Sequence, residues 1–394
     1  MSSAGAKGLP ERHEEEEGGP MSDLRGVLGE HVDNGSVPGA VALVARGGEA
    51  EVSAVGGSMA RDSIFRIASL TKPITAAAVM VLVDDGRLAL DDPVARWLPE
   101  LGSPVVVRTP ASPIDDVVPA NRPITVFDLL TSRSGHGFPS DFSLPAIQPL
   151  FSELRQGPPQ PHVVPAPDDW MAALSRIPLL HQPGKTWLYN TSSDIQGVLV
   201  SRVANRPLPE FLAERLFDPL GMVDTGFAVP AAKRERLTSL YGTGENGFEL
   251  VDGQNGQWGS LPAFASGAGG LVSTADDWYR FARMLLAEGA VDGRQLLSAE
   301  SVRLMTTDHT TAAQREASAL FLEGQGWGFG GSVDVAAIDP WNVPGRYGWV
   351  GGTGTAAHIV PSTGTVTILL SQLQMSGPTP PTLMRDFWTY AAQS

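Results

Sequence analysis

The chain has 394 residues, of which 42% are hydrophobic and 7% aromatic, with a formal net charge of −15 and no cysteine. That composition is typical of a globular protein, and the length exceeds the roughly 250–300 residues at which one hydrophobic core stops growing, so we expect two lobes. The acidic charge argues against nucleic acid and membrane surfaces as partners, and the lack of cysteine excludes thiol nucleophiles, disulfides and thiolate metal sites.

Residues 1–20 are predicted to form a disordered acidic tail. They contain a run of glutamates and no apolar stretch of the kind that a signal peptide carries. Met21 is an alternative start of the protein. The chain has no run of about 18 apolar residues, the length that a transmembrane helix needs. We therefore expect a cytoplasmic protein.

The first predicted elements are a helix that ends at Asn34, a hairpin with strands 40–45 and 50–55, and a second helix at 74–83. The first helix has apolar residues at helical spacing, and the two strands flank a glycine-containing turn. Residues 74–83 are apolar at nearly every position, which indicates a buried helix. The segment Ser69–Lys72 therefore lies at the mouth of a helix that runs into the core.

The middle of the chain is first irregular and then helical. Residues 99–168 are rich in proline, with one short helix at 124–130. A loop of this length is usually functional or disordered; we interpret it as a wall over the site, the alternative being a solvated excursion. Further helices are predicted at 169–177, 193–204 and 208–216.

Strand patterns return toward the C-terminus. Residues 355–360 and 365–371 flank a Pro-Ser-Thr-Gly turn and predict a hairpin. A shorter strand at 270–273 precedes a helix at 276–287, and a last helix is predicted at 382–392.

This order of elements predicts an α/β protein of the α+β type. Early and late strands would share one antiparallel sheet flanked by helices, and the middle would form a mostly helical second lobe. We place the sheet domain at residues 21–66 and 266–394 and the helical domain at residues 67–265.

The run Ser69-Leu70-Thr71-Lys72 is the first candidate for chemistry. A serine hydroxyl is a weak nucleophile and needs a base within hydrogen-bond reach. Residues three apart on a helix share a face, so Lys72 can touch Ser69 if a helix begins there. Pro73 favours this, because proline is tolerated in a first turn. The alternative is a chance pair on a solvated face.

Two later segments are further candidates. Tyr189 lies in a loop before a helix and could relay a proton to the serine, or it is a packed aromatic. The run from Trp349 to Thr355 contains three glycines. Such a run lets a ligand approach the backbone, and a tight turn is the alternative.

Together these segments resemble the serine β-lactamase and penicillin-binding-protein superfamily, in the branch with class C β-lactamases and family VIII carboxylesterases. Ser69-Leu70-Thr71-Lys72 matches the Ser-x-x-Lys element, Tyr189 matches the tyrosine element, and Trp349-Val350-Gly351 stands where Lys-Thr-Gly or His-Thr-Gly is found. The likeness runs from about residue 22 to the end. It implies the β-lactamase-like fold, with the active site between the sheet domain and the helical lobe.

The resemblance also implies a mechanism. Ser69 would attack an ester or amide carbonyl, Lys72 and Tyr189 would share the proton transfers, and the oxyanion would sit between the backbone N–H groups of Ser69 and Gly352. Which of Lys72 and Tyr189 is the base stays open. No cofactor and no metal are implied, and the histidines show no ligand spacing.

Departures from the lactamase pattern point to esters as substrates. Trp349 replaces the cationic or hydrogen-bonding residue that holds a substrate carboxylate, and Thr191 stands where class C enzymes have asparagine. Both features look like family VIII esterases. Arg346 is close in sequence and could still supply a positive charge. The candidate substrate contacts are Trp349, Gly351, Phe138, His136, Thr191 and Arg346.

The leading hypothesis is therefore a carboxylesterase that cleaves short-chain esters of small molecules through an acyl-serine. The main alternative is a class C-like β-lactamase or a D-amino-acid-specific peptidase. An acyltransferase and a non-catalytic penicillin-recognising binding protein rank lower. The sequence leaves the oligomeric state open.

Overall fold

The computed structural model describes residues 23–157 and 160–393, so the predicted acidic tail at 1–20 lies outside the described residues. Its centre is a seven-stranded antiparallel sheet in the order β11-β12-β13-β14-β15-β1-β2. The strands are β1 (Ala40–Arg46), β2 (Glu49–Val55), β11 (Gly326–Trp327), β12 (Ser332–Val333), β13 (Tyr347–Gly351), β14 (Thr355–Val360) and β15 (Thr365–Ser371). The pairing of β1 with β15 confirms that early and late strands share one antiparallel sheet.

Strand β1 shows how the sheet divides two cores. Its side chains alternate between the faces, as the period of a strand requires. One set, Ala40, Ala42 and Val44, packs in a core with the terminal helices α1 (Leu24–Asp33) and α13 (Thr382–Gln393). The other set joins the larger core that contains the buried helix α2 (Thr71–Asp84) and α9 (Ala275–Leu286). The fold is thus a sheet flanked by helices, as predicted.

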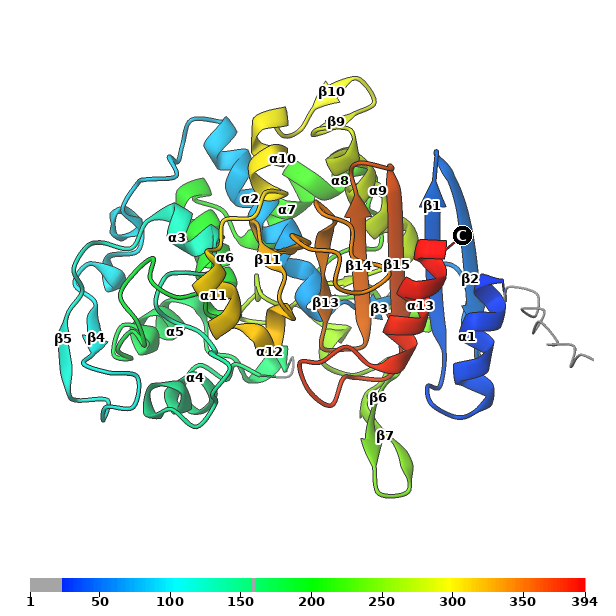
Figure 1. Cartoon of the computed structure of the whole chain (residues 1–394), viewed down its shortest axis with the longest axis horizontal. Helices are drawn as coiled ribbons and strands as arrows, with labels where there is room; N and C mark the ends of the chain where they lie inside the picture. The colour runs from blue at the N-terminus through cyan, green and yellow to red at the C-terminus, as the bar shows by residue number, and fades with distance from the viewer. Residues whose placement is uncertain (1–22, 158–159, 394) are drawn as a thin grey trace, which may run out of the picture.

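Most remaining helices lie beyond the β11 side of the sheet, at the left of Figure 1. Those at the left are α3 (Val126–Leu130), α4 (Gln148–Ser152), α5 (Pro167–Leu174), α6 (Thr191–Ala204) and α11 (Ala312–Ala317). The other helices are α7 (Leu208–Leu212), α8 (Asp218–Leu220), α10 (Ala299–Met305) and α12 (Ala319–Leu322). A π-helical turn, Ala213–Phe217, joins α7 to α8. We continue to propose a sheet domain at residues 21–66 and 266–394 and a helical domain at residues 67–265.

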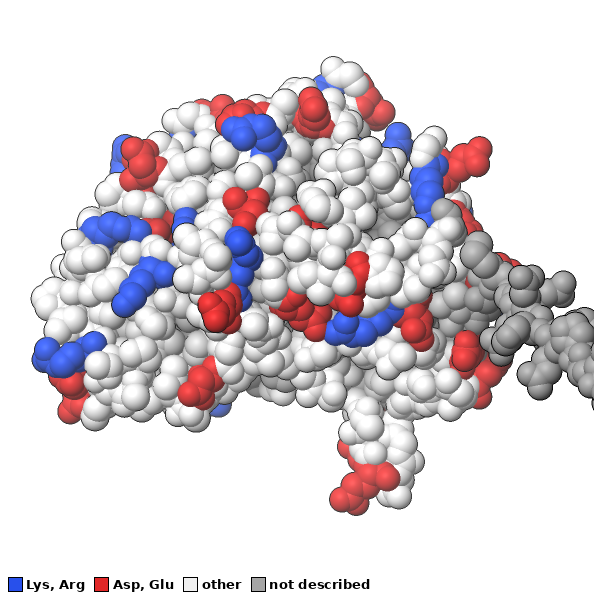
Figure 2. Space-filling view, viewed as in Figure 1, with Lys and Arg blue, Asp and Glu red and all other residues white. Residues whose placement is uncertain are grey.

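Four short antiparallel pairs lie outside the main sheet: β3 (Phe65–Arg66) with β8 (Val272–Ser273), β4 (Val105–Val107) with β5 (Val117–Pro119), β6 (Leu240–Gly244) with β7 (Gly247–Asp252), and β9 (Ala290–Val291) with β10 (Arg294–Gln295). The β6–β7 hairpin projects from the body and carries acidic side chains near its tip (Figure 2). Within the described ranges, no helix combines the length and apolar character needed to cross a bilayer.

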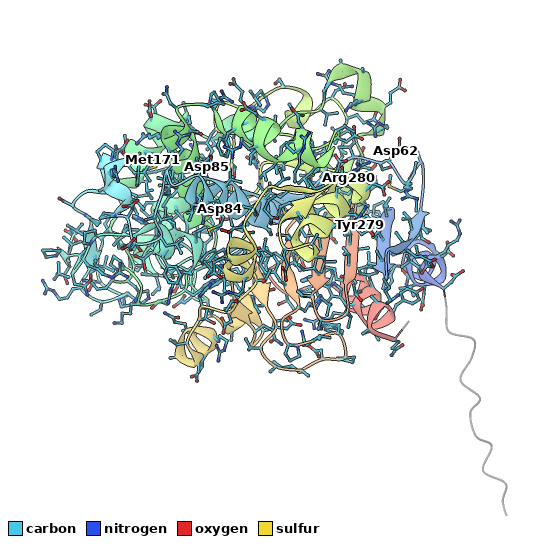
Figure 3. All side chains as sticks on the ribbon, turned by 90° about the horizontal axis from the view of Figure 1, so that it is seen from above. Asp62, Asp84, Asp85, Met171, Tyr279 and Arg280 are labelled. Carbon is cyan, nitrogen blue, oxygen red and sulfur yellow. The ribbon has the colours of Figure 1, made fainter. Side chains whose placement is uncertain are left out.

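The far end of α2 is held by Asp84, its last residue, and by Asp85, the residue that follows it; Figure 3 labels both. Asp84 accepts hydrogen bonds from the backbone N–H of Ser298 at 2.7 Å and from the hydroxyl of Ser301 at 2.7 Å. Asp85 pairs with Arg215 at 2.7 Å. The exposed end of the helix that begins beside Ser69 is therefore fixed to two other parts of the chain.

Candidate active site

Ser69 lies in a tight turn directly before α2. The turn spans Ala68–Leu70, and the helix begins at Thr71. Ala68 adopts a left-handed backbone with φ of 43°, a conformation that costs energy in a residue with a Cβ. The first helical turn holds Lys72, whose exposed fraction is 1%. The prediction that Ser69–Lys72 lies at the start of a buried helix is confirmed.

The ammonium of Lys72 has three hydrogen-bond acceptors around it. Nζ lies 2.9 Å from Ser69 Oγ, 2.8 Å from Asn190 Oδ1 and 2.7 Å from the carbonyl oxygen of Ala268. An ammonium has three hydrogens to donate, so the charged form uses all of them. Every polar direction of this buried side chain is therefore satisfied.

The same contacts orient the neutral amine. An uncharged Lys72 keeps two hydrogens, and both Asn190 Oδ1 and the Ala268 carbonyl can only accept. The nitrogen lone pair is then left facing Ser69 Oγ, where a base is needed. Burial lowers the pKa of Lys72 and so favours this form, although the phenol of Tyr189 and the carboxyl of Asp194 act in the opposite direction.

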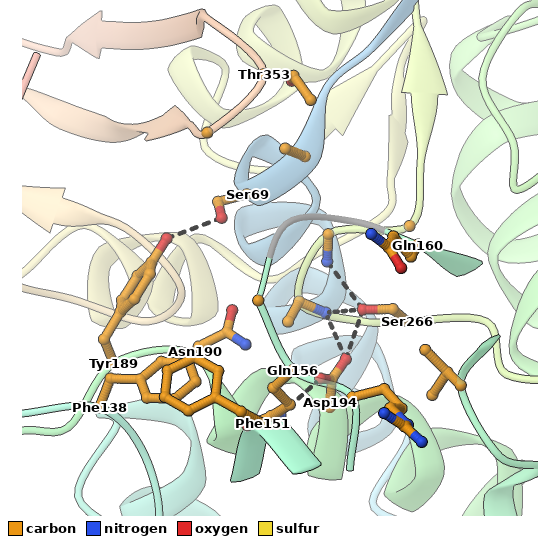
Figure 4. Close-up of a pocket in the computed structure, with 18 of the residues that line it drawn as sticks. Ser69, Phe138, Phe151, Gln156, Gln160, Tyr189, Asn190, Asp194, Ser266 and Thr353 are labelled. Carbon is orange, nitrogen blue, oxygen red and sulfur yellow. Dashed lines mark hydrogen bonds between the residues drawn. The ribbon is translucent and has the colours of Figure 1, made fainter. Parts of the chain in front are cut away.

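Tyr189 reaches Ser69 from the other side. Its hydroxyl lies 2.8 Å from Ser69 Oγ (Figure 4). The indole N–H of Trp349 donates to the phenol oxygen at 2.9 Å. The backbone of Tyr189 is held by two hydrogen bonds of 2.9 Å with Phe138. A chain of hydrogen bonds thus runs from Trp349 through Tyr189 to Ser69.

Asn190 occupies an unusual backbone conformation that aims its side chain at Lys72. Its φ is 79° and its ψ is −65°, and the N–H of Thr191 donates to the carbonyl of Tyr189 at 3.1 Å. This is the γ-turn with positive φ, which is rare and strained. Strain of this kind persists where the surrounding structure imposes it, often at functional sites.

A buried carboxylate holds the segment that supplies the Ala268 carbonyl. Asp194 accepts hydrogen bonds from Ser266 Oγ at 2.6 Å, from the Ala268 N–H at 3.1 Å and from Gln156 Nε2 at 3.0 Å. Burial raises the pKa of Asp194, while these hydrogen bonds oppose the shift. The network fixes the backbone on which one of the Lys72 acceptors sits.

Gly351 allows strand β13 to come close to the serine turn. A Cβ at this position would lie 2.5 Å from the carbonyl oxygen of Ile67 and 2.2 Å from Thr355 Oγ1. The glycine therefore serves this approach, and the next residue, Gly352, lines the same cavity as Ser69. Ser69 and Gly352, the two residues expected to supply the oxyanion hole, therefore line one cavity.

The cavity beside Ser69 has a volume of about 380 Å³ and contains Tyr189, Trp349, Gly352 and Phe138 among its lining residues. The structure thus brings these predicted site residues together. It also shows two side chains that sequence reasoning missed as lining, Asn190 and Asp194. Two features of the sequence could have indicated Asn190 as a site residue. It directly follows Tyr189, and asparagine tolerates positive φ better than most residues.

Three predicted substrate contacts point elsewhere. The hydroxyl of Thr191 is buried and donates to Gln156 Oε1 at 2.6 Å. His136 is buried against the carbonyl of Ile177 at 2.9 Å, and burial lowers its pKa to about 4. The guanidinium of Arg346 lies 3.5 Å from Asp334, and the residue is 5% exposed. We therefore leave these three side chains out of the proposed substrate contacts.

Comparison with known proteins identifies the family. The family model described as Beta-lactamase matches residues 24–385. Protein Rv1367c of Mycobacterium tuberculosis is 43% identical over 322 residues, which cover 80% of this chain and 78% of that protein. Esterase EstB of Burkholderia gladioli is 31% identical over 374 residues, which cover 86% of this chain and 88% of that protein.

A solved structure shows the same fold. EstCE1, a hydrolase with promiscuous acyltransferase activity, has a TM-score of 0.73 at 24% identity, with 92% of this chain and 97% of that chain covered. The resemblance found in the sequence motifs is confirmed by these matches. The chain therefore belongs to the β-lactamase and penicillin-binding-protein-like superfamily of serine hydrolases.

Proposed function

We propose that this protein is a carboxylesterase that works through an acyl-serine on Ser69. The observation that carries the proposal is the hydrogen-bond chain from Trp349 through Tyr189 to Ser69, with Lys72 on the other side of the same hydroxyl. Similarity to esterase EstB supports it.

In the proposed acylation, neutral Lys72 takes the proton of Ser69 as Oγ attacks the ester carbonyl. The oxyanion is held by the backbone N–H groups of Ser69 and Gly352; removal of one such donor typically costs about 10²–10³ in rate. As the carbonyl re-forms, the leaving alcohol takes the hydroxyl proton of Tyr189. The N–H of Trp349 then stabilises the phenolate, because hydrogen bonds to charged acceptors are the stronger ones.

Deacylation restores every group. Water gives one proton to the phenolate of Tyr189, and its hydroxide attacks the acyl carbon. When the bond to Ser69 breaks, Oγ takes back the proton that Lys72 holds. One ester and one water are converted to one acid and one alcohol, and no further reactant is needed.

The alternative of a β-lactamase or D-amino-acid-specific peptidase is less well supported. Substrates of those enzymes carry a carboxylate, and Trp349 offers an indole N–H that is already used by Tyr189. Arg346, the nearby cation in the sequence, is paired with Asp334 and 5% exposed. An ester that carries no charge at this position fits these contacts better.

The test is hydrolysis of p-nitrophenyl acetate and butyrate by wild type, Ser69→Ala and Lys72→Ala, with a chromogenic cephalosporin and a D-alanyl peptide beside them. Ser69→Ala should fall to background, and Lys72→Ala should lose roughly 10²–10⁴ in kcat. Ser58→Ala, an exposed serine in a loop, is the matched control and should keep full activity. Ester hydrolysis by Ser69→Ala at the wild-type rate would contradict the proposal. Faster hydrolysis of the cephalosporin than of any ester would favour the β-lactamase alternative.

A further inference from the structure

Four phenylalanine rings form one wall of the cavity beside Ser69. Phe138, Phe142, Phe151 and Phe321 all line it, and we call this group the phenylalanine wall. They come from separate parts of the chain: the irregular segment before α4, helix α4 itself, and α12. The fold therefore brings Phe321 against three rings that are close to one another in the sequence.

The wall is continuous and ends on Tyr189. Phe138 stacks on Phe151 with ring centroids 4.8 Å apart, and Phe142 lies 5.7 Å from Phe138 and 6.0 Å from Phe321. Phe321 stacks on the ring of Tyr189 at 4.7 Å. Figure 4 shows Phe138 and Phe151 beside Tyr189 in the pocket. A group held on these rings is therefore held next to the hydroxyl of Ser69.

Two features indicate that the wall serves a ligand. Phe142 lines the cavity and is 37% exposed, so the wall has a side that a ligand can reach from solvent. The cavity volume of about 380 Å³ lies within the range of roughly 300–1,000 Å³ found for sites that bind drug-sized ligands. An acetyl or butyryl group alone would leave much of this space empty.

Resting on the proposed esterase activity, we propose that the ester substrate carries a bulky apolar group with at least one ring, which packs against the phenylalanine wall. Aromatic partners adopt offset or edge-to-face contacts with such rings. A rigid ring also loses less conformational freedom on binding than a flexible chain of the same carbon count. The ring group belongs to the acyl part or to the alcohol part of the ester, and the experiment separates these two sources.

The first experiment compares esters of equal carbon count and similar intrinsic reactivity. In the acyl series, p-nitrophenyl 3-phenylpropanoate is compared with p-nitrophenyl nonanoate. In the alcohol series, 3-phenylpropyl acetate is compared with nonyl acetate. We expect the ring ester to exceed its linear partner in kcat/KM by about tenfold in one series, which assigns the ring to that side of the ester.

Each outcome has one meaning. Equal or better turnover of the linear ester in both series overturns the ring preference and leaves the proposed esterase activity intact. Failure to hydrolyse any ester overturns the proposed function and this proposal with it.

The second experiment tests the wall by substitution. Phe142→Ala and Phe151→Ala should each lower the ratio of kcat/KM for the ring ester over the linear ester by about tenfold, and Phe151→Leu by less. Phe248→Ala is the matched control, because Phe248 is 40% exposed on the β6–β7 hairpin and should leave the ratio unchanged.

Thermal unfolding of each variant checks that it folds. If Phe151→Ala does not fold, Phe142→Ala still decides the question, because its ring is partly exposed. An unchanged ratio in a folded Phe142→Ala would overturn the proposal.

Discussion

The indole N–H of Trp349 lies 2.9 Å from the phenol oxygen of Tyr189 and donates to it. Because an indole can only donate, this contact uses the phenol oxygen as an acceptor and leaves the hydroxyl hydrogen of Tyr189 for Ser69 Oγ, 2.8 Å away. Trp349 thereby sets the direction of the proposed proton path. The sequence motif alone suggested a substrate contact at this position.

Removal of that one N–H should slow the reaction. In Trp349→Phe an aromatic ring remains, but the phenolate that we propose for Tyr189 loses a donor. We expect kcat with p-nitrophenyl acetate to fall at least about tenfold, because roughly 1.5–3 kcal/mol is the usual contribution of one hydrogen bond to a charged group and about 1.4 kcal/mol corresponds to a factor of ten. Steady-state kinetics measure this. Trp341→Phe, at a site that packs on Trp388, should change kcat less than twofold; equal effects of the two variants would contradict the account.

Asn190→Asp should move the pH dependence of activity. The new carboxylate would stand about where Oδ1 now accepts from Lys72 at 2.8 Å and would favour the ammonium. A negative charge this close raises the pKa of a lysine, so less neutral amine is present at neutral pH. We expect kcat/KM at pH 7 to fall about tenfold or more and to recover as pH rises, because the base is the deprotonated form.

The matched control for this shift is Asn205→Asp. Asn205 also has a left-handed backbone, with φ of 52°, but it caps the far end of α6 and is exposed. Its pH profile should coincide with that of wild type. A profile of Asn190→Asp that also coincides with wild type would argue against Lys72 as the base.

Lys72→Arg separates a base from a fixed positive charge. The guanidinium keeps the charge and can donate to the same acceptors, but it does not deprotonate in proteins. We expect kcat to fall roughly 10²–10⁴-fold, the usual contribution of a general base. Lys185→Arg, at an exposed lysine, serves as the control. Retention of most of the activity in Lys72→Arg would assign this residue an electrostatic role only.

His136 should make stability, rather than activity, depend on pH. Burial lowers its pKa to about 4 in the folded chain, against about 6.5 when unfolded. Between these values the unfolded chain binds the proton and the folded chain does not, so the free energy of unfolding falls as pH falls from 6.5 toward 4. The loss is on the order of 3 kcal/mol.

Urea unfolding of wild type and His136→Gln at pH 7.5, 6 and 5 measures this effect. The variant should lose less stability than wild type as the pH is lowered. His162→Gln, an exposed histidine, should follow wild type at each pH. Parallel curves for wild type and His136→Gln would contradict the assignment of a buried neutral imidazole.

Regular elements with strong local patterns could be predicted from the sequence. Strands β14 and β15 have the predicted bounds, 355–360 and 365–371, because a Pro-Ser-Thr-Gly turn separates two apolar runs. Strand β13 was missed: its glycines indicated a turn, and it is a strand because Trp349 and its neighbours pair with β14. Pairing between strands is a property of the fold that local sequence does not carry.

The site residues that belong to sequence motifs could be predicted. Those whose side-chain direction depends on packing could not. Ser69, Lys72 and Tyr189 meet in the structure as the motifs implied. Asn190 contacts Lys72 only because a γ-turn aims it there. His136, two residues before the cavity-lining Phe138, turns into the interior instead. Side chains that are close in sequence can therefore point in different directions. For the same reason the phenylalanine wall could not be predicted from the sequence.

The central claim, an acyl group carried by Ser69, is tested most directly by mass spectrometry of the acyl-enzyme. Wild type is mixed with p-nitrophenyl butyrate, quenched in acid within the first turnover and digested, and the acylated peptide is fragmented. The account predicts a butyryl group on Ser69 of the wild type and none on the corresponding peptide of Ser69→Ala. A butyryl group at another residue, or ester hydrolysis at the wild-type rate by Ser69→Ala, would contradict it.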